Sequence, residues 1–410
     1  MRHAPCAMRQ SGEIVTHNDG SRCPLCGGEN LLDVLRIEQV PVYCNVLWPD
    51  EQQARRAARG DLALRYCDAC AHLFNAAFDP RLTEYTPAYD NSLHYSPRFN
   101  EYAEELAAEL VTRYALRGKR IVEIGCGKGD FLRMLCTRGD NWGFGFDRSF
   151  EPHRAEDGTH ERVLFFQEFY DEAHARRCRP DFLCCRHVPE HLEQPIDFLA
   201  GVRSTLGDRR ESAFYCEVPN ALFTLKDMGI WDLIYEHCGY FTLHSLSAAF
   251  TGAGFDVVAG DESFGGQFIW VVARPGTGHA AAPLPAGHAP AHLRRYADTF
   301  ADQYRARVRA WRERLACMAQ EGRRAVVWGG GSKGVTFLNV LREHHDIRYV
   351  VDLSPHKQGR YVAGTGQQVV SPDFLRSYGA TDVIVMNPLY VDEISRMVRS
   401  MGLDLQLIPV

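Results

Sequence analysis

The sequence of 410 residues lacks the marks of several protein classes. It has no apolar run approaching the roughly 18 residues that span a bilayer, and the first twenty residues lack the hydrophobic core of a signal peptide. It also lacks an excess of basic residues, because its formal net charge is −6. A negative net charge gives no overall electrostatic attraction to the phosphate backbone of a nucleic acid. We expect a cytoplasmic protein with no membrane and no nucleic-acid partner.

The distribution of the cysteines does not indicate a disulfide framework. Of 14 cysteines, four form two close pairs, Cys23-x-x-Cys26 and Cys67-x-x-Cys70, and the others are scattered. Two such knuckles present four thiolates at the corners of a tetrahedron, which is the closed geometry of structural Zn²⁺. We predict a structural zinc ion, with Cys44 or His72 as a substitute ligand and four unliganded thiols as the alternative.

The length predicts more than one domain. We expect a flexible tail over residues 1–20 and a zinc-binding domain over 21–80. Strand and helix patterns alternate over 81–274 and again over 291–410, which is typical of α/β folds, and a linker rich in Ala, Pro and Gly lies at 275–290. The last domain opens on a helical stripe, which we expect to pack on its own lobe rather than form a dimer seam. Its residues are Leu293, Tyr296, Phe300, Tyr304, Val308, Trp311, Leu315 and Met318.

A glycine-rich turn follows the predicted strand 120–124. Its spacing, G-x-G-x-G behind an acidic residue, resembles the first motif of class I S-adenosylmethionine (SAM) methyltransferases. Asp147 ends the next predicted strand, where a carboxylate can accept hydrogen bonds from both ribose hydroxyls. We predict a SAM site and a central Rossmann-like domain. The cofactor-binding candidates are Glu123, Gly125, Gly127, Gly129, Phe131, Asp147 and His187.

Polar residues cluster after the fourth strand of that domain and further along the chain. The segment Asp181–His191 ends in two histidines and a glutamate, at the strand edge where open α/β sheets bind ligands. Glu217-Val-Pro-Asn220 follows, and then Tyr235-Glu236-His237 with Tyr240-Phe241 close behind.

These segments, with Tyr89-Asp-Asn-Ser92 and the stretch 351–359, resemble the deoxysugar C-methyltransferases, which methylate C3 of nucleotide-linked 4-keto sugars. The resemblance covers nearly the whole chain. It implies an N-terminal four-cysteine zinc domain, a central SAM domain and a smaller C-terminal Rossmann-like domain. The chain departs from the family at Tyr235-Glu236, where one histidine is missing, and at Phe264–Phe268, where the family has His-Gly-Gly-Ser-x-Arg. The second departure leaves the identity of the sugar open.

The resemblance also implies roles for individual residues. A base must remove the proton beside the ketone, and donors must stabilise the enolate. We expect His237 to be this base, Glu236 to orient or assist it, and His191 and Tyr89 to hold the keto oxygen. The expected substrate-binding residues are Tyr235, Asn220, Tyr240 and Lys333.

The C-terminal domain contains Gly329–Gly334, which fits G-x-G-x-x-G, followed by Asp352 at the end of the next strand. We weigh three interpretations: phosphate contact assisted by Lys333, pure scaffolding, and an NAD site. The leading function is SAM-dependent C-methylation of a nucleotide-linked keto-sugar by a monomer or weak homodimer. The alternatives are an O- or N-methyltransferase of another small metabolite and a zinc-ribbon RNA-modifying methyltransferase.

Overall fold

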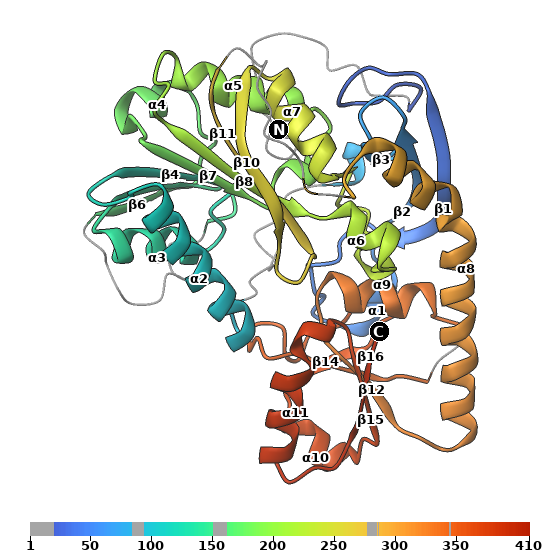
Figure 1. Ribbon diagram of the computed structural model, residues 1–410. Helices are drawn as coiled ribbons and strands as arrows, with labels where there is room; N and C mark the ends of the chain where they lie inside the picture. Colours follow the sequence, from blue (N-terminus) through green and yellow to red (C-terminus); the bar gives the residue numbers. More distant parts are fainter. Residues whose placement is uncertain (1–19, 84–93, 151–161, 277–284, 286, 344–345) are drawn as a thin grey trace.

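The computed structural model describes residues 20–83, 94–150, 162–276, 285, 287–343 and 346–410. These residues form three sheets of four, seven and five strands. In Figure 1 the seven-stranded sheet lies at the upper left, the four-stranded sheet at the upper right and the five-stranded sheet below them. Among the described helices, none combines the length and the apolar character needed to cross a bilayer.

The N-terminal sheet is antiparallel and takes its last strand from the middle of the chain. Its strands are β1 (Leu31–Pro41), β2 (Arg59–Cys67), β3 (Leu73–Asn75) and β9 (Gly239–Tyr240), and the short helix α1 (Glu51–Arg55) joins β1 to β2. Leu73 pairs with Tyr240 and Phe74 with Gly239. A Cβ at Gly239 would stand 3.2 Å from the ring of His72, so a glycine lets β9 lie this close. The sheet therefore extends beyond the predicted domain 21–80.

The central sheet has the strand order β10-β11-β8-β7-β4-β5-β6, and only β11 runs against both of its neighbours. Helices α2 and α3 cover one face, whereas α4, α5 and α7 cover the other (Figure 1). The predicted strand 120–124 is confirmed. The bounds are β4 (Arg120–Ile124), β5 (Trp142–Phe146), β6 (Val163–Phe166), β7 (Phe182–Arg186), β8 (Ala213–Pro219), β10 (Phe255–Ser263), β11 (Phe268–Pro275), α2 (Pro97–Arg113), α3 (Asp130–Gly139), α4 (Glu172–Cys178), α5 (Pro195–Leu206), α6 (Ala221–Lys226) and α7 (Leu243–Gly252).

The C-terminal sheet is parallel throughout, in the order β14-β13-β12-β15-β16. The strands β12, β13 and β15 are short, mostly apolar segments, and nearly all of their residues are buried. The bounds are β12 (Ala325–Trp328), β13 (Tyr349–Val351), β14 (Gln368–Val370), β15 (Asp382–Val385), β16 (Gln406–Pro409), α9 (Ser332–Val340), α10 (Phe374–Tyr378) and α11 (Val391–Ser400).

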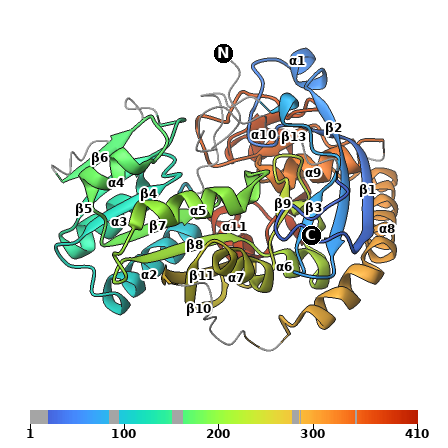
Figure 2. The same cartoon turned by 90° about the horizontal axis from the view of Figure 1, so that it is seen from above.

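Helix α8 (Pro290–Gln320) runs along one side of the molecule and joins the N-terminal sheet to the C-terminal lobe (Figures 1 and 2). Its predicted stripe is buried within the chain, except that Tyr296 is only half-buried. The first half of the helix packs against the N-terminal sheet, where Arg294 Nη1 lies 2.5 Å from Asp68 Oδ1 and the Tyr66 hydroxyl donates to the carbonyl of Pro290. The prediction of packing on its own lobe was therefore only half right.

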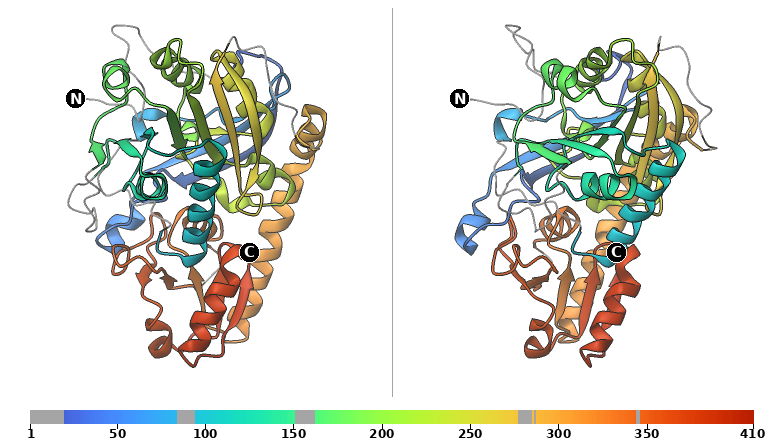
Figure 3. Two further views of the ribbon diagram at one scale, coloured as in Figure 1. Left: turned by 60° about the vertical axis from the view of Figure 1, so that its left-hand side comes forward. Right: turned by 90° about the vertical axis from the view of Figure 1, so that its left-hand side faces the viewer.

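The C-terminal lobe is also tied to the central domain by polar pairs. The amides of Gln267 and Asn387 exchange two hydrogen bonds of 2.9 and 3.0 Å in a buried position. Elsewhere the Ser96 hydroxyl donates to Glu393 over 2.8 Å. Figure 3 shows the lobe lying directly beneath the central domain in two further views.

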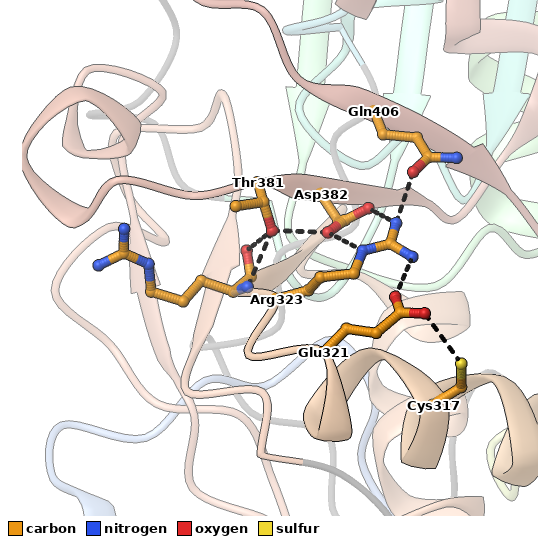
Figure 4. Close-up of polar contacts among 7 residues, drawn as sticks. Cys317, Glu321, Arg323, Thr381, Asp382 and Gln406 are labelled. Carbon is orange, nitrogen blue, oxygen red and sulfur yellow. Dashed lines mark hydrogen bonds and ion pairs between the residues drawn. The ribbon is translucent and has the colours of Figure 1, made fainter.

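An ion pair secures the far edge of the C-terminal lobe (Figure 4). The Arg323 guanidinium donates to the carboxylate of Asp382, whose side chain is 1% exposed, and to Gln406 Oε1. A cavity of about 610 Å³ opens beside this network, at the amino ends of β12 and β13. This edge is opposite the glycine-rich loop that follows β12.

We predict that Asp382→Ala destabilises the protein. The change leaves Arg323 without its buried partner, and hydrogen bonds to charged groups contribute about 1.5–3 kcal/mol each. The free energy of unfolding, measured by urea titration, should fall by that order. Asp302→Ala is the control, since Asp302 pairs with Arg305 but is 90% exposed, and we expect a change below about 0.5 kcal/mol. Equal effects of the two changes would contradict the prediction.

Candidate active site

The glycine-rich loop lies between β4 and α3, and its backbone requires glycine. Gly125, Gly127 and Gly129 all have positive φ, of 74°, 52° and 84°. A Cβ at Gly125 would stand 2.2 Å from Val188, and one at Gly129 would stand 2.3 Å from Phe165. Gly127 differs, because a Cβ there would meet no described atom within 4 Å. The loop therefore packs tightly at both ends and opens at its centre, beside the start of α3.

Two acids flank this loop. Asp147 Oδ2 accepts the Gly127 N–H at 2.8 Å, and its other oxygen accepts the N–H of Ser149. Glu123 is buried, and its Oε2 has no hydrogen-bond partner among the described residues. Burial raises the pKa of Glu123 to about 8. A cationic donor beside it, such as the ammonium of SAM, would satisfy that orphaned oxygen.

Phe131 lies in the core instead of facing the open centre of the loop. Its side chain is buried, and the Arg186 guanidinium lies 4.2 Å from the centroid of its ring. Phe131 thus packs in the core beside the loop. Its contact with the cofactor stays a prediction.

His187 holds a strained position at the end of β7. Its φ is 55°, in the left-handed region that a non-glycine residue enters at a cost. Its N–H donates to the carbonyl of Glu217 at 2.8 Å. Its ring lies between two acids, with Nδ1 3.7 Å from Glu190 Oε1 and Nε2 3.4 Å from Glu217 Oε1. The surrounding contacts thus fix this ring at the carboxyl edge of the sheet.

Glu217 belongs to a buried network that the sequence did not indicate. Its carboxylate accepts from Arg186 Nε at 2.9 Å, from the Tyr215 hydroxyl at 2.8 Å and from the Tyr102 hydroxyl. Burial opposes ionisation of Glu217, but Arg186 and the neighbouring hydrogen bonds outweigh it and hold the pKa well below its usual range. Glu217 is therefore a fixed anion behind His187.

His191 and His237 form a pair of rings with centroids 4.8 Å apart and an edge-to-face arrangement. His191 Nδ1 lies 2.9 Å from the carbonyl oxygen of Glu236. A carbonyl can only accept, so Nδ1 carries the proton and Nε2 keeps its lone pair. Burial, followed by repulsion from His191, His187 and Lys333, lowers the pKa of His237 well below 6.5. The imidazole of His237 is therefore neutral near pH 7 and has a ring-nitrogen lone pair, but its lowered pKa makes it a weaker base than a free imidazole.

Glu236 and His237 point to different neighbours. Glu236 Oε2 accepts the N–H of Cys44, in the N-terminal domain, at 2.7 Å, and burial raises the pKa of Glu236 to about 7. Glu236 thus holds its loop in place, and no hydrogen bond to the His237 ring occurs among the described residues. Cys44 does not belong to the group of four cysteines that could hold a metal ion. Its prediction as a substitute zinc ligand is therefore wrong.

The other predicted substrate residues have structural partners. The hydroxyl of Tyr235 contacts the backbone of Asp79, and that of Tyr240 bonds both backbone groups of Ile234. Asn220 caps α6, and its Nδ2 donates to Gly266 and to Glu262. Tyr240 also lies beside His237, with ring centroids 5.9 Å apart. Direct contact of Tyr235, Tyr240 and Asn220 with substrate stays a prediction. Tyr89 lies outside the described residues.

Lys333 approaches this region from the C-terminal lobe. Its Nζ lies 2.5 Å from Oδ1 of Asp232, which precedes His237 by five residues in the sequence. The loop before α9 repeats the arrangement at the SAM motif, since Asp352 Oδ2 accepts the Gly330 N–H at 2.8 Å. Lys357 Nζ stands 3.7 Å from the same oxygen and adds positive charge.

The four paired cysteines converge. Cys23 Sγ lies 3.6 Å from Cys70 Sγ, and Cys26 Sγ lies 3.6 Å from Cys67 Sγ. All four sulfur atoms lie within 4.8 Å of one another, which is close enough for the group to hold one metal ion. His72 is not in this group. Its ring is buried against Phe241, with centroids 4.7 Å apart.

Comparison with known proteins identifies two family domains. The methyltransferase domain family matches residues 99–259, and the C-methyltransferase C-terminal domain family matches residues 286–403. The chain is 25% identical over 376 residues to the C-methyltransferase NovU of Streptomyces niveus, with 86% of each chain covered.

Solved structures similar to this chain include methyltransferases that match less than half of it. They include the N,N-8-amino-8-demethyl-D-riboflavin dimethyltransferase RosA of Streptomyces davawensis, with 21% identity, a TM-score of 0.35 and coverage of 44% of this chain and 56% of RosA. Another is the magnesium protoporphyrin IX methyltransferase ChlM of Synechocystis, with 16% identity, a TM-score of 0.33 and coverage of 43% and 83%.

We predict that Gly127→Ala weakens SAM binding at least roughly tenfold, because the new methyl group would enter the open centre of the loop. Isothermal titration calorimetry measures this affinity. Gly118→Ala is the matched control: Gly118 precedes the other end of β4, has φ of 62° and also has no described atom within 4 Å of a Cβ. Both changes carry the backbone cost of about 1–2 kcal/mol. If both variants bound SAM equally well, the open centre would not be the cofactor's place.

Proposed function

Because the chain belongs to the SAM-dependent C-methyltransferases, we propose that its substrate is a nucleotide-linked keto-sugar, methylated on the carbon beside the ketone. The observation that carries the proposal is the neutral imidazole of His237, placed with His191 at the carboxyl edge of the SAM-binding sheet. A methyl transfer to carbon needs such a base, because the carbon must first lose a proton.

The proposed reaction begins with transfer of that proton to His237. The electron pair of the C–H bond becomes the enolate, whose oxygen is stabilised by nearby donors. The Nδ1–H of His191 is already donated to the carbonyl of Glu236. Lys333, whose positive charge lies near His237, is a described group that can turn toward this oxygen. SAM, which the glycine-rich loop and Asp147 would hold, would supply the methyl group to the enolate carbon and leave as S-adenosylhomocysteine. The chain contributes mainly the alignment of the two reactants.

The C-terminal lobe would hold the nucleotide part of the substrate. The N–H groups at the start of α9 and the side chain of Lys333 suit a diphosphate, and Lys357 adds charge at the same loop. The lobe already reaches the catalytic region through the Lys333–Asp232 pair. This placement would put the sugar beside His237.

We also propose that the four cysteines bind a structural Zn²⁺. Four thiolates form a closed site with no position for substrate, so the metal acts as scaffold. Its influence on catalysis would pass through β3, which follows Cys70 directly and pairs with β9 two residues after His237. No disulfide joins any of the described cysteines, so the four thiols remain available to a metal ion.

We predict that His237→Ala binds SAM normally but transfers methyl at least roughly a hundredfold more slowly, the usual scale for a general base. The sharper test is solvent deuterium exchange at the carbon beside the ketone, followed by mass spectrometry without SAM. The unaltered protein should exchange this position, and the variant should not. His292→Ala, at an exposed residue of α8, is the control and should retain both activities.

Unaltered exchange in His237→Ala would remove the imidazole from the mechanism. Methyl transfer to an oxygen or nitrogen, with no exchange at all in the unaltered protein, would favour the alternative of a different small metabolite.

We predict that Cys23→Ser lowers the zinc content from one ion per chain toward zero and reduces methyl transfer, because β3 and β9 lose their anchor. Plasma mass spectrometry measures the metal. Cys317→Ser is the control, since Cys317 is exposed on α8 and should keep full zinc content. A Cys23→Ser protein without zinc but with full activity would refute the scaffold role.

A further inference from the structure

We propose that Glu190, His191 and His237 form a second metal site, which takes a divalent transition ion such as Zn²⁺, Co²⁺ or Ni²⁺ at the catalytic centre. The ligand atoms of these three residues lie within 4.8 Å of one another. The site is separate from the four cysteines in both residues and chemistry, since it offers two nitrogens and one carboxylate.

Glu190 supplies the first independent observation. Its side chain is 2% exposed, yet neither carboxylate oxygen has a hydrogen-bond partner among the described residues. An unpaired carboxylate costs several kcal/mol to bury. The nearest cationic candidate, His187 Nδ1, stands 3.7 Å away. A cation on the other side, between the carboxylate and the two imidazoles, would satisfy both oxygens.

His191 supplies the second independent observation. Its Nδ1–H donates to the carbonyl of Glu236 at 2.9 Å, which leaves the Nε2 lone pair free. Metal-binding histidines almost always donate their other ring N–H to a carbonyl or carboxylate, because this contact fixes the tautomer and the ring orientation. His191 is therefore already in the form and orientation that a ligand needs.

The backbone holds the three ligands in a fixed arrangement. Glu190 and His191 lie in the single 3-10 turn Pro189–His191 after β7, and His237 lies two residues before the start of β9. The thiol of Cys238 lies 3.6 Å from the carbonyl of Glu190 and links the two segments. A site preorganised in this way loses little entropy when an ion binds.

The ligand set selects the ion. Mg²⁺ and Ca²⁺ prefer oxygen ligands throughout, whereas two imidazoles and a carboxylate suit Zn²⁺ and its neighbours and leave an open coordination position. Because the ion would use the His237 lone pair, metal binding and proton abstraction by His237 exclude each other. This consequence rests on the proposed function: a bound ion inhibits methyl transfer.

The binding test uses Co²⁺ added to full-length protein whose four-cysteine site is filled with zinc. We expect one further equivalent of Co²⁺, with the weak visible bands of nitrogen and oxygen ligation and no thiolate charge-transfer band. Glu190→Gln keeps the shape of the side chain but lowers its charge, and should weaken Co²⁺ binding at least roughly tenfold; His292→Ala should leave it unchanged. Retained zinc content and SAM affinity show that each variant is folded.

No binding beyond the zinc site, a thiolate band, or unchanged affinity in Glu190→Gln would overturn the second site. Methyl transfer is then assayed with and without Co²⁺, and again after EDTA with the zinc content rechecked. Reversible inhibition is the expected result. Binding of Co²⁺ without inhibition would keep the metal site and overturn His237 as the base, so the two proposals fail separately.

Discussion

The arrangement of the catalytic region depends on one short piece of sheet. Two residues of the central domain, Gly239 and Tyr240, complete the antiparallel sheet that carries the cysteine pairs. This pairing fixes the segment just after His237, and the Glu236–Cys44 hydrogen bond fixes the segment just before it. The imidazole of His237 is therefore held from both sides by the N-terminal domain. Under the proposed function the central domain would hold SAM, and both domains would be needed to bring the two reactants together.

The two Rossmann-like units use one local arrangement for related purposes. In each, an aspartate at the end of the second strand accepts an N–H from the glycine loop after the first strand. The central unit adds a buried acid, Glu123, whereas the C-terminal unit adds Lys333 and Lys357. The first loop thus favours a cationic ligand group and the second an anionic one. The two units therefore differ in the charge of the residues beside the glycine loop more than in the spacing of its glycines.

The sequence was most informative where the signal is local. The strand before the glycine loop, the paired cysteines and the stripe of α8 follow from periodicity and spacing over short windows, and the structure has them. Contacts between distant segments carry no such signal. β9 has two residues and no strand pattern, the Glu217 network joins α2 to β7 and β8, and Glu236 turns toward Cys44. Asn220 and Tyr235 occupy motif positions, yet their polar groups also serve the backbone around them.

The Gln267–Asn387 pair joins the central domain to the C-terminal lobe. Two neutral amides that satisfy each other carry no formal charge, and neither titrates between acidic and alkaline pH. Salt screens ion pairs but acts little on such a contact. This fastening between the lobes should accordingly hold across changes of ionic strength and acidity that loosen the Lys333–Asp232 bridge. Of these two contacts between the lobes, the Lys333–Asp232 ion pair should respond to salt and pH, whereas the Gln267–Asn387 pair should not.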